Sequence, residues 1–390
     1  AVKRQLVSDV EVGSYLSGGM DSGSITAIAS QSTKNLKTFT CGFDLTSASG
    51  IELGFDERQK AKFMSNIFKT DHTEFILKAN DMQNCLKDLT YHLEEPRVGQ
   101  SYPNYYAAKM ASEKVKVILS GAGGDELFAG YPWRYFKSSQ NSYFIDSELD
   151  IYTRGFDDYI DKYYKYWQRL IPNSKIPSVF KPIWNEVNHI WTRNIFKSVF
   201  RNYHQIKFRN TNDFINNSLY FEAKTFLHGL LVVEDKISMS QSLETRLPFL
   251  DNDLVDFALK CPLNVKINNI EDVKKIDEND LLKKASLNVN NGISGKQILK
   301  KAMLDILPDE IINHKKQGFS SPDASWFKGD SINFVRNTLL NGNARIYELL
   351  DRKAVTSLVE QHLNGEQNRR LLIWSLLNVE SWMRQLSFEA

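Results

Sequence analysis

The sequence has little cysteine, no long apolar run and almost no excess charge of either sign. Its three cysteines, Cys41, Cys85 and Cys261, are odd in number, far apart and without a CxxC pair. This pattern is typical of a reducing compartment and argues against a disulfide framework or a zinc site. No apolar run approaches the roughly 20 residues of a membrane span, and no basic-then-apolar signal leads the chain. We therefore expect a cytoplasmic protein with no membrane partner.

The charge balance excludes a further class of partner. Lysine and arginine number 49 against 47 acidic residues, and both signs are interspersed, so electrostatics give no reason to expect nucleic-acid binding. The 390 residues, 42% of them apolar, suit a soluble protein of two domains. The sequence opens without Met and enters a strand-like run within about a dozen residues. We interpret it as a piece of a longer chain or a processed product.

Strands and helices alternate in the first third of the chain. Short β-branched runs predict strands at 10–17, 37–43, 71–77 and 115–120, and helical spacing predicts helices at 24–32, 55–68 and 102–114. Such alternation indicates an α/β fold, a parallel sheet with helices on both faces. Ligands of such sheets bind at the carboxyl ends of strands, where both glycine-rich turns of this region fall. We assign 1–132 to a nucleotide-binding region.

The remaining residues, 133–390, differ in composition and in hydrophobic pattern. Aromatic residues are dense at helical spacing, as in 159–167 and 190–200, and strand patterns disappear. We predict a mainly helical region whose aromatic stripes form packing core rather than a ligand box. The Asn- and Lys-rich segment 265–295 predicts a surface helix with a mobile loop.

The first glycine turn, Ser17-Gly-Gly-Met-Asp-Ser22, joins a strand to a helix. Its glycines let backbone N–H groups approach an anion, its hydroxyls bind phosphate oxygens, and the helix N-terminus adds partial positive charge. It lacks the GxxxxGK[ST] pattern, and Asp21 would repel a bare phosphate unless it holds Mg²⁺. The alternative is a plain turn in which Asp21 and Ser22 cap the helix.

The second turn, ILSGAGGDELFAGY at 118–131, repeats the order strand, Ser, glycines, Asp. Adjacent parallel strands end at the same edge of a sheet, so Asp21 and Asp125 are predicted to share one metal ion.

Four segments carry a resemblance to a known family. Residues 7–25 (VSDVEVGSYLSGGMDSGSI) resemble the pyrophosphate-loop motif of the asparagine synthetase family, and 115–131 its second nucleotide motif. Residues 234–251 (EDKISMSQSLETRLPFLD) and 316–327 (KQGFSSPDASWF) are similar to two later signatures. The resemblance implies a pyrophosphate-loop fold and an ATP- and Mg²⁺-dependent ligase. Such an enzyme activates a small-molecule carboxylate as an acyl-adenylate, releases pyrophosphate, and transfers the acyl group to ammonia or an amine.

Carried over by position, the resemblance also implies site residues. Catalytic roles fall to Lys296, Asp21 and Asp125, the two aspartates being the metal ligands, with Lys300 and Lys301 as close rivals of Lys296. The implied ATP-binding residues are Leu16, Ser17, Gly18, Gly19, Asp21, Ser22, Cys41, Gly42, Ser120 and Gly121, with Cys41 and Gly42 against the adenine.

The acceptor pocket is predicted less sharply. Its candidates are Glu94, Glu95, Gly123, Glu244 and Arg246. Glu94 and Glu95 are equally well explained as a helix-end charge cluster. Glu244, Arg246 and Asp251 are equally well explained as a buried ion-pair corner. Asp56 and Glu57 suit a helix start, and His72 is interpreted as a structural histidine rather than a base.

Two departures from the family leave alternatives open. The family's acidic residue in the second motif is Ala122 here, and alanine cannot take a proton from ammonium. The family's N-terminal glutaminase domain is absent from this sequence, and we expect it in a longer chain or as a separate partner. Ala122 therefore argues against the usual conversion of aspartate to asparagine, and an acid of a macrocycle- or β-lactam-forming or sugar-acid reaction is the alternative acceptor. Two alternative functions stay open: tRNA thiolation or tRNA lysine modification, and a nucleotide-binding scaffold. For the oligomeric state we consider a homodimer.

Overall fold

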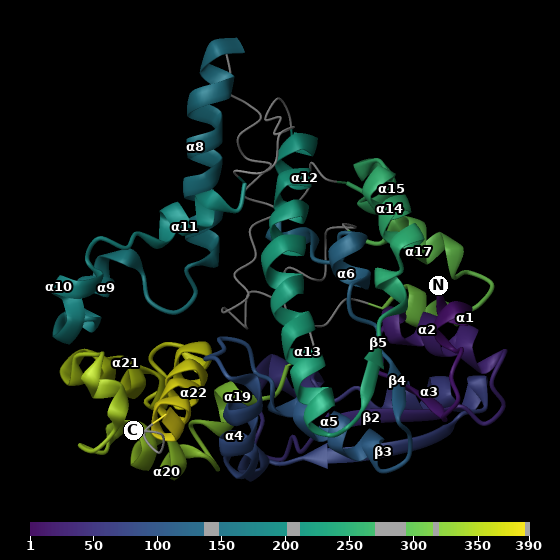
Figure 1. The fold of residues 1–390 in the computed structure, drawn as a ribbon, viewed down its shortest axis with the longest axis horizontal. Coiled ribbons are helices and arrows are strands. Elements are labelled where there is room, and N and C mark those ends of the chain that lie inside the picture. The colour runs from purple at the N-terminus through teal and green to yellow at the C-terminus, as the bar shows by residue number, and fades with distance from the viewer. Residues whose placement is uncertain (136–147, 201–210, 270–293, 315–319, 387–390) are drawn as a thin grey trace.

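A five-stranded parallel sheet forms the base of the molecule, as Figure 1 shows for the computed structural model. The structure describes residues 1–135, 148–200, 211–269, 294–314 and 320–386. In spatial order the strands are β3 (Asp71–Leu77), β2 (Lys37–Phe43), β1 (Val12–Tyr15), β4 (Val117–Leu119) and β5 (Glu244–Arg246). The register pairs Gly13 with both Lys37 and Ile118, so the two glycine turns leave adjacent strands at the same edge.

The sequence predicted the first four strands and missed the fifth. Strands β2 and β3 have the predicted bounds, whereas β1 and β4 are shorter than predicted. The expectation that strands end with the first third of the chain was wrong, because Glu244–Arg246 adds an edge strand beside β4. Three residues of sequence Glu-Thr-Arg carry no apolar periodicity by which to recognise a strand.

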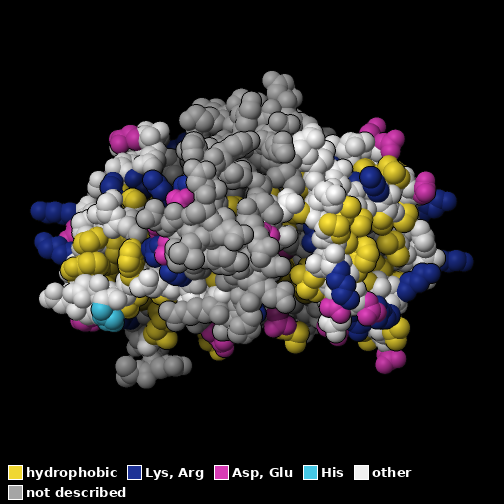
Figure 2. Space-filling view, turned by 90° about the horizontal axis from the view of Figure 1, so that it is seen from above, with side chains coloured by type: hydrophobic (Ala, Val, Ile, Leu, Met, Phe, Trp, Pro, Cys, Tyr) yellow, Lys and Arg dark blue, Asp and Glu magenta, His cyan; other side chains and the backbone are white. Residues whose placement is uncertain are grey.

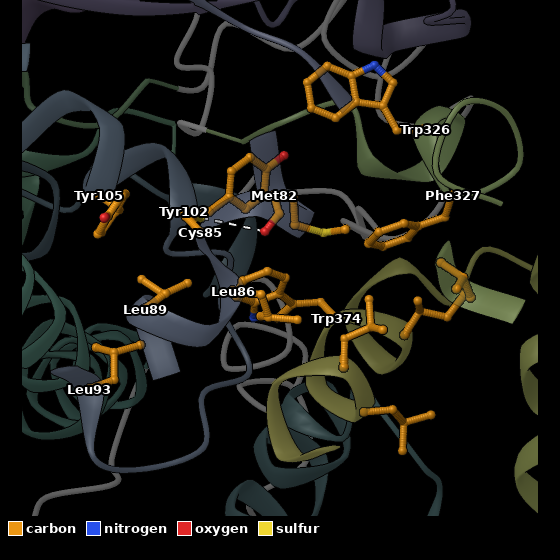
Figure 3. Close-up of a cluster of buried hydrophobic side chains, with 14 of the residues drawn as sticks. Met82, Cys85, Leu86, Leu89, Leu93, Tyr102, Tyr105, Trp326, Phe327 and Trp374 are labelled. Atoms are coloured by element: carbon orange, nitrogen blue, oxygen red, sulfur yellow. Dashed lines mark hydrogen bonds between the residues drawn. The ribbon is translucent and has the colours of Figure 1, made fainter. Parts of the chain in front are cut away.

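Helices cover both faces of the sheet, which confirms the α/β fold. Successive residues of β4 divide between the two layers. Ile118 packs in the cluster of α4 (Ala79–Leu93) and α5 (Tyr102–Ser112), whereas Leu119 packs with α2 (Met20–Ser30). Helix α3 (Arg58–Phe68) packs beside α2 on that second face. Figure 3 shows part of the larger core, where side chains of α4 and α5 meet Trp326, Phe327 and Trp374.

The rest of the described chain is mainly helical, as predicted. Its helices are α6 (Gly124–Leu127), α8 (Glu148–Trp167), α9 (Ile176–Val179), α10 (Trp184–Val187), α11 (Thr192–Ser198), α12 (Thr211–Glu222), α13 (His228–Ser240), α14 (Asn252–Lys260), α15 (Leu263–Lys266), α17 (Gln297–Ala302), α18 (Asp309–Ile312), α19 (Asp323–Trp326), α20 (Ile332–Val335), α21 (Arg352–Leu363) and α22 (Arg370–Leu386), and the short α1 (Val2–Gln5) lies at the N-terminus. Most of the predicted 265–295 segment lies outside the described residues. In the described part, no helix is long and apolar enough to span a membrane.

The aromatic stripes form packing core, as predicted. Eight buried side chains make one cluster between α8, α11 and α12: Tyr159, Ile160, Tyr163, Tyr164, Phe196, Phe200, Phe214 and Phe221. Helix α12 continues through a π-helical turn, Ala223–Leu227, into α13, and together they form the long upright helix at the centre of Figure 1. On the face shown in Figure 2, basic and acidic side chains are interspersed among apolar ones.

Candidate active site

A cavity of about 670 Å³ opens at the carboxyl ends of β1, β2 and β4. One wall is a face of α13 and the turn before it, where Phe226, Gly229, Leu230, Val233, Glu234 and Ile237 recur at helical spacing. The residues after α4 and the start of α5 form another wall. This size is within the usual range of small-molecule sites.

The first glycine turn is held by its own hydroxyls. Ser22 Oγ accepts a hydrogen bond from the Ser17 backbone N–H at 3.0 Å, and Ser17 Oγ accepts one from the Gly19 N–H at 3.1 Å. A Cβ at Gly18 would lie 2.9 Å from Cδ of Lys60, so the loop passes against α3. Leu16, Ser17, Asp21 and Ser22 line the cavity, whereas Gly18 and Gly19 do not.

The second turn packs directly against the first. Its Ser120, Gly121 and Gly123 line the cavity, and Gly123 has the left-handed φ of 96° that favours glycine. A Cβ at Gly124 would lie 2.7 Å from Asp21 Oδ1. The close approach of the two turns therefore needs glycine at this point.

Lys296 joins the two turns through its ammonium group. Its Nζ lies 2.7 and 2.5 Å from the carboxylate oxygens of Asp21 and 2.5 Å from Oδ1 of Asp125. All three side chains are at most 13% exposed. The Lys296 backbone N–H donates to Phe128 O at 2.9 Å, and a Cβ at Gly130 would lie 1.9 Å from Asp125 Oδ1. The absence of a side chain on Gly130 thus leaves room for the Asp125 carboxylate and the end of the Lys296 side chain.

Two carboxylates that converge on one cation fit a magnesium site. Among the described residues, no group of three or more His, Cys, Asp or Glu side chains is placed to hold a metal. Mg²⁺ needs no such cage, since it commonly takes one or two carboxylates and completes its shell with water and substrate phosphates. Asp21 and Asp125 are therefore the residues that would hold it.

Cys41 and Gly42, which were both predicted to lie against the adenine, differ in whether they line the cavity. Cys41 lines the cavity, and its burial raises the pKa of its thiol to about 12, so it acts there as an apolar wall. Gly42 does not line the cavity. A Cβ on it would lie 2.4 Å from Asp56 Oδ1 and 2.5 Å from Arg58 Cδ, so this glycine makes room for the Asp56–Arg58 ion pair.

Of the five acceptor-pocket candidates, only Gly123 lines the cavity. Glu94 ends α4 with a left-handed φ of 61°, is mostly exposed and pairs with Lys236 at 2.6 Å. Glu95 is half-exposed and lies 3.1 Å from Arg97. Glu94 and Glu95 therefore form a charge cluster at the end of α4 and do not line the cavity.

The expected ion-pair corner is also different from the prediction. Glu244 pairs with Arg246 at 2.6 Å, but Glu244 is exposed and Arg246 binds the carbonyls of Gln5 and Val7. Asp251 instead pairs with Arg4 at 2.7 Å and caps α14. The three residues do not form one buried corner, because β5 runs along the open edge of the sheet.

Three further residues have placements that bear on their interpretation. Asp56 is two residues before the start of α3, and Glu57 is its N-cap and lines the cavity. His72 Nδ1 lies 2.9 Å from Thr38 Oγ1, and burial lowers its pKa, as suits a structural histidine.

Sequence reasoning missed four charged residues of the cavity, Arg97, Glu126, Arg134 and Glu234. Glu234 is partly buried on α13, and burial raises the pKa of its carboxyl to about 7, with a hydrogen bond from Ser120 acting in the opposite direction. Arg97 lines the same cavity from the segment after α4. An acid in the apolar run GLLVVE is the signal that could have pointed to Glu234, whereas Arg97 had none.

The chain is thus an α/β protein whose two glycine turns place Asp21 and Asp125 at a cavity by the strand ends, where such folds bind their ligands. The asparagine synthase family profile matches residues 1–384, and the chain belongs to this family.

Curated relatives agree with this family. The chain is 29% identical over 406 residues to "Asparagine synthetase [glutamine-hydrolyzing] 1" of Bacillus subtilis, covering 98% of the chain and 57% of the relative. It is 26% identical over 407 residues to a putative asparagine synthetase of Mycobacterium bovis, covering 98% and 56%. It is 23% identical over 412 residues to "Amidase chyE" of Penicillium rubens, covering 93% and 56%. The chain spans little more than half the length of these relatives. Family and relatives together support an ATP-dependent ligase.

Proposed function

We propose that this chain forms an amide from a carboxylate, ATP and an amine, through an acyl-adenylate, with release of AMP and pyrophosphate. The observation that carries the proposal is the convergence of Asp21, Asp125 and Lys296 between two glycine turns at one cavity. A carboxylate pair, a lysine and a loop rich in N–H and hydroxyl donors are the groups that phosphate displacement requires.

In the first step, an oxygen of the acceptor carboxylate bonds to the α-phosphorus, and the bond from that phosphorus to the pyrophosphate oxygen breaks. Ser17 and Ser22 supply hydroxyls to the phosphates, and Lys296 supplies a point charge against the negative charge that develops there. Mg²⁺, when held by Asp21 and Asp125, neutralises phosphate charge.

In the second step, the amine nitrogen bonds to the acyl carbon, the bond from that carbon to the phosphate oxygen breaks, and AMP leaves. The nitrogen must lose a proton. Ala122, which lines the cavity, cannot accept it, but Glu234 lies in the same cavity and its pKa of about 7 suits a base at neutral pH. We therefore assign the proton to the Glu234 carboxylate.

The nitrogen source and the acceptor belong to the proposal as well. Two of the relatives are named as glutamine-hydrolysing asparagine synthetases, one of them as putative, so aspartate and ammonia are the first pair to test. We propose that a glutaminase domain, in a longer chain or a separate partner, supplies the ammonia. A macrocycle, β-lactam or sugar-acid acceptor with its own amine is the alternative.

The test is pyrophosphate release that depends on both acid and amine. With ¹⁸O in the acceptor carboxylate, one labelled oxygen should appear in AMP, because the carboxylate oxygen remains on phosphorus when the amide forms. The Asp21→Asn variant should lose this transfer. ATP binding without turnover on any acid would instead favour a nucleotide-binding protein that has lost catalysis, the candidate that Ala122 supports.

A further inference from the structure

We propose that the hydroxyl of Tyr15 donates a hydrogen bond to the carbonyl oxygen of the acyl group in the second step of the proposed reaction. Tyr15 is the last residue of β1, two residues before the first glycine turn, and it lines the cavity. The inference rests on the proposed function, because it assigns one more residue to the same transfer.

The sheet places Tyr15 beside Ser120 of the neighbouring strand. Ser14 pairs with Leu119 in the register, so Tyr15 and Ser120 come next on β1 and β4. Ser14 and Leu119 face α2, since Ser14 Oγ lies 2.9 Å from Thr26 Oγ1 and Leu119 packs in the cluster of that helix. Side chains alternate along a strand, so Tyr15 and Ser120 face the opposite layer. The Tyr15 ring accordingly packs against the core cluster of α4 and α5.

This placement brings Tyr15 close to the carboxylate of Glu234. Ser120 hydrogen-bonds Glu234 and accepts the Ala122 N–H at 3.4 Å. Neighbouring strands lie about 4.8 Å apart, so Tyr15 is one strand spacing from the residue that holds this carboxylate. Burial and then the charge of Glu234 raise the pKa of the Tyr15 hydroxyl. The hydroxyl therefore keeps its proton at neutral pH and is a hydrogen-bond donor.

Tyr15 also brings an uncommitted donor to the cavity. Three other hydroxyl groups of the cavity lining donate to backbone carbonyls, namely those of Thr40, Thr225 and Ser238. Within the described ranges of the chain, no hydrogen bond joins the Tyr15 hydroxyl to another group, whereas its backbone carbonyl accepts from Ser14 Oγ at 3.3 Å. The Tyr15 donor is thus available to a ligand.

The second step of the reaction has a use for a neutral donor. When the amine nitrogen bonds to the acyl carbon, an electron pair of the C=O bond moves onto the oxygen. The pair returns as the bond from carbon to the phosphate oxygen breaks and AMP leaves. A donor that is already in place stabilises the transient negative charge, and Tyr15 keeps its proton throughout. Glu234, which takes the proton of the nitrogen, lies next to this donor.

A contact with the ribose is the competing assignment for Tyr15. Cys41, which was expected against the adenine, is also a neighbour of the hydroxyl. Glu234 contributes more than Cys41 to the raised pKa of Tyr15, so the hydroxyl lies on the side of the group that meets the amine. This favours the acyl oxygen.

The experiment uses Tyr15→Phe, which removes the hydroxyl and keeps the ring that packs in the core. Tyr106→Phe is the matched control, because the Tyr106 hydroxyl donates to Asp81 O at 3.0 Å and does not line the cavity. L-Aspartate and ammonia are the first substrates. ATP–pyrophosphate exchange measures the first step, and single-turnover transfer from the preformed adenylate to ammonia measures the second.

We expect Tyr15→Phe to slow the second step about 10²- to 10³-fold, with exchange and KM for ATP within about 3-fold of wild type. The rate of the second step should keep its inflection near pH 7, because Glu234 remains the base. Tyr106→Phe should change each value by less than about 2-fold.

Full transfer activity in Tyr15→Phe, equal losses in both steps, or a raised KM for ATP would overturn the assignment. A shifted inflection would overturn it too, since Tyr15 would then act only by positioning Glu234.

If no acid supports exchange, the proposed function fails, and calorimetric binding of aspartyl-sulfamoyl adenosine, a stable analogue of the adenylate, decides the inference separately. Binding that weakens about 3- to 10-fold in Tyr15→Phe, with AMP binding unchanged, would uphold the hydrogen bond. No binding to wild type, no weakening in the variant, or equal weakening of AMP would overturn it.

Discussion

The partly buried carboxyl of Glu234 should make the stability of this protein fall as pH rises through neutrality. Burial raises the pKa of Glu234 from 4.5 to about 7. Between these values the folded protein holds a proton that the unfolded chain has released, so raising the pH removes stability, and the loss levels off above about pH 7. At about 1.4 kcal/mol per pH unit, the total is about 3 kcal/mol, of which about 2.5 kcal/mol falls between pH 5 and 8.5.

The assay is urea unfolding of wild type and Glu234→Gln at pH 5 and 8.5. Glutamine keeps the volume and cannot ionise, so the variant should gain about 2.5 kcal/mol relative to wild type on going from pH 5 to 8.5. The same substitution at Glu360, which pairs with Arg336 outside the cavity, gives the control curve. Equal pH dependence of wild type and Glu234→Gln would refute the assignment of this effect to Glu234.

The same variant separates the two chemical steps. Acceptor-dependent ATP–pyrophosphate exchange should persist in Glu234→Gln, whereas amide formation should fall about 10²- to 10⁴-fold if Glu234 takes the amine proton. Unchanged amide formation would contradict its role as a base while leaving the stability argument intact.

Three further predictions concern the cation site. Lys296→Met should lower kcat for pyrophosphate release about 10²- to 10³-fold, whereas Lys301→Met, on the exposed side of α17, should not. Asp21→Asn should lower pyrophosphate release at least about 100-fold, and added Mg²⁺ should not restore it, as a titration would show. Gly130→Ala places a Cβ 1.9 Å from Asp125 Oδ1 and should abolish calorimetric ATP binding. Gly329→Ala, whose nearest neighbour is 3.4 Å away, should bind ATP normally and thereby exclude a general effect of added methyl groups.

The sequence predicted local features well where the signal is local. Strands 37–43 and 71–77 are recovered with their bounds, because their apolar, β-branched residues lie between turn residues. The convergence of Asp21 and Asp125 follows from two similar turns on neighbouring parallel strands. Strand β5 was not predicted, because its position is set by pairing with β4 rather than by the pattern of its own residues.

The far walls of the cavity depend on tertiary packing. Lys296 lies 275 residues from Asp21, and only the family resemblance connected them. Glu94 looked like a pocket acid, but a left-handed turn directs the chain to the surface there. Arg97 and Glu234 belong to segments brought together by α4, α13 and α22, and no spacing within either segment encodes that contact.

The bridge made by Lys296 has a consequence for the order of binding. Two buried carboxylates normally repel each other, but here the protein supplies its own counter-ion. The single ammonium offsets one of the two negative charges, and a divalent ion that arrives alone must displace the Lys296 ammonium from both carboxylates. When a nucleotide binds together with the metal, its phosphates can pair with the Lys296 ammonium, so the ammonium no longer competes with the metal for the two carboxylates. The site is thereby biased toward metal and nucleotide entering together.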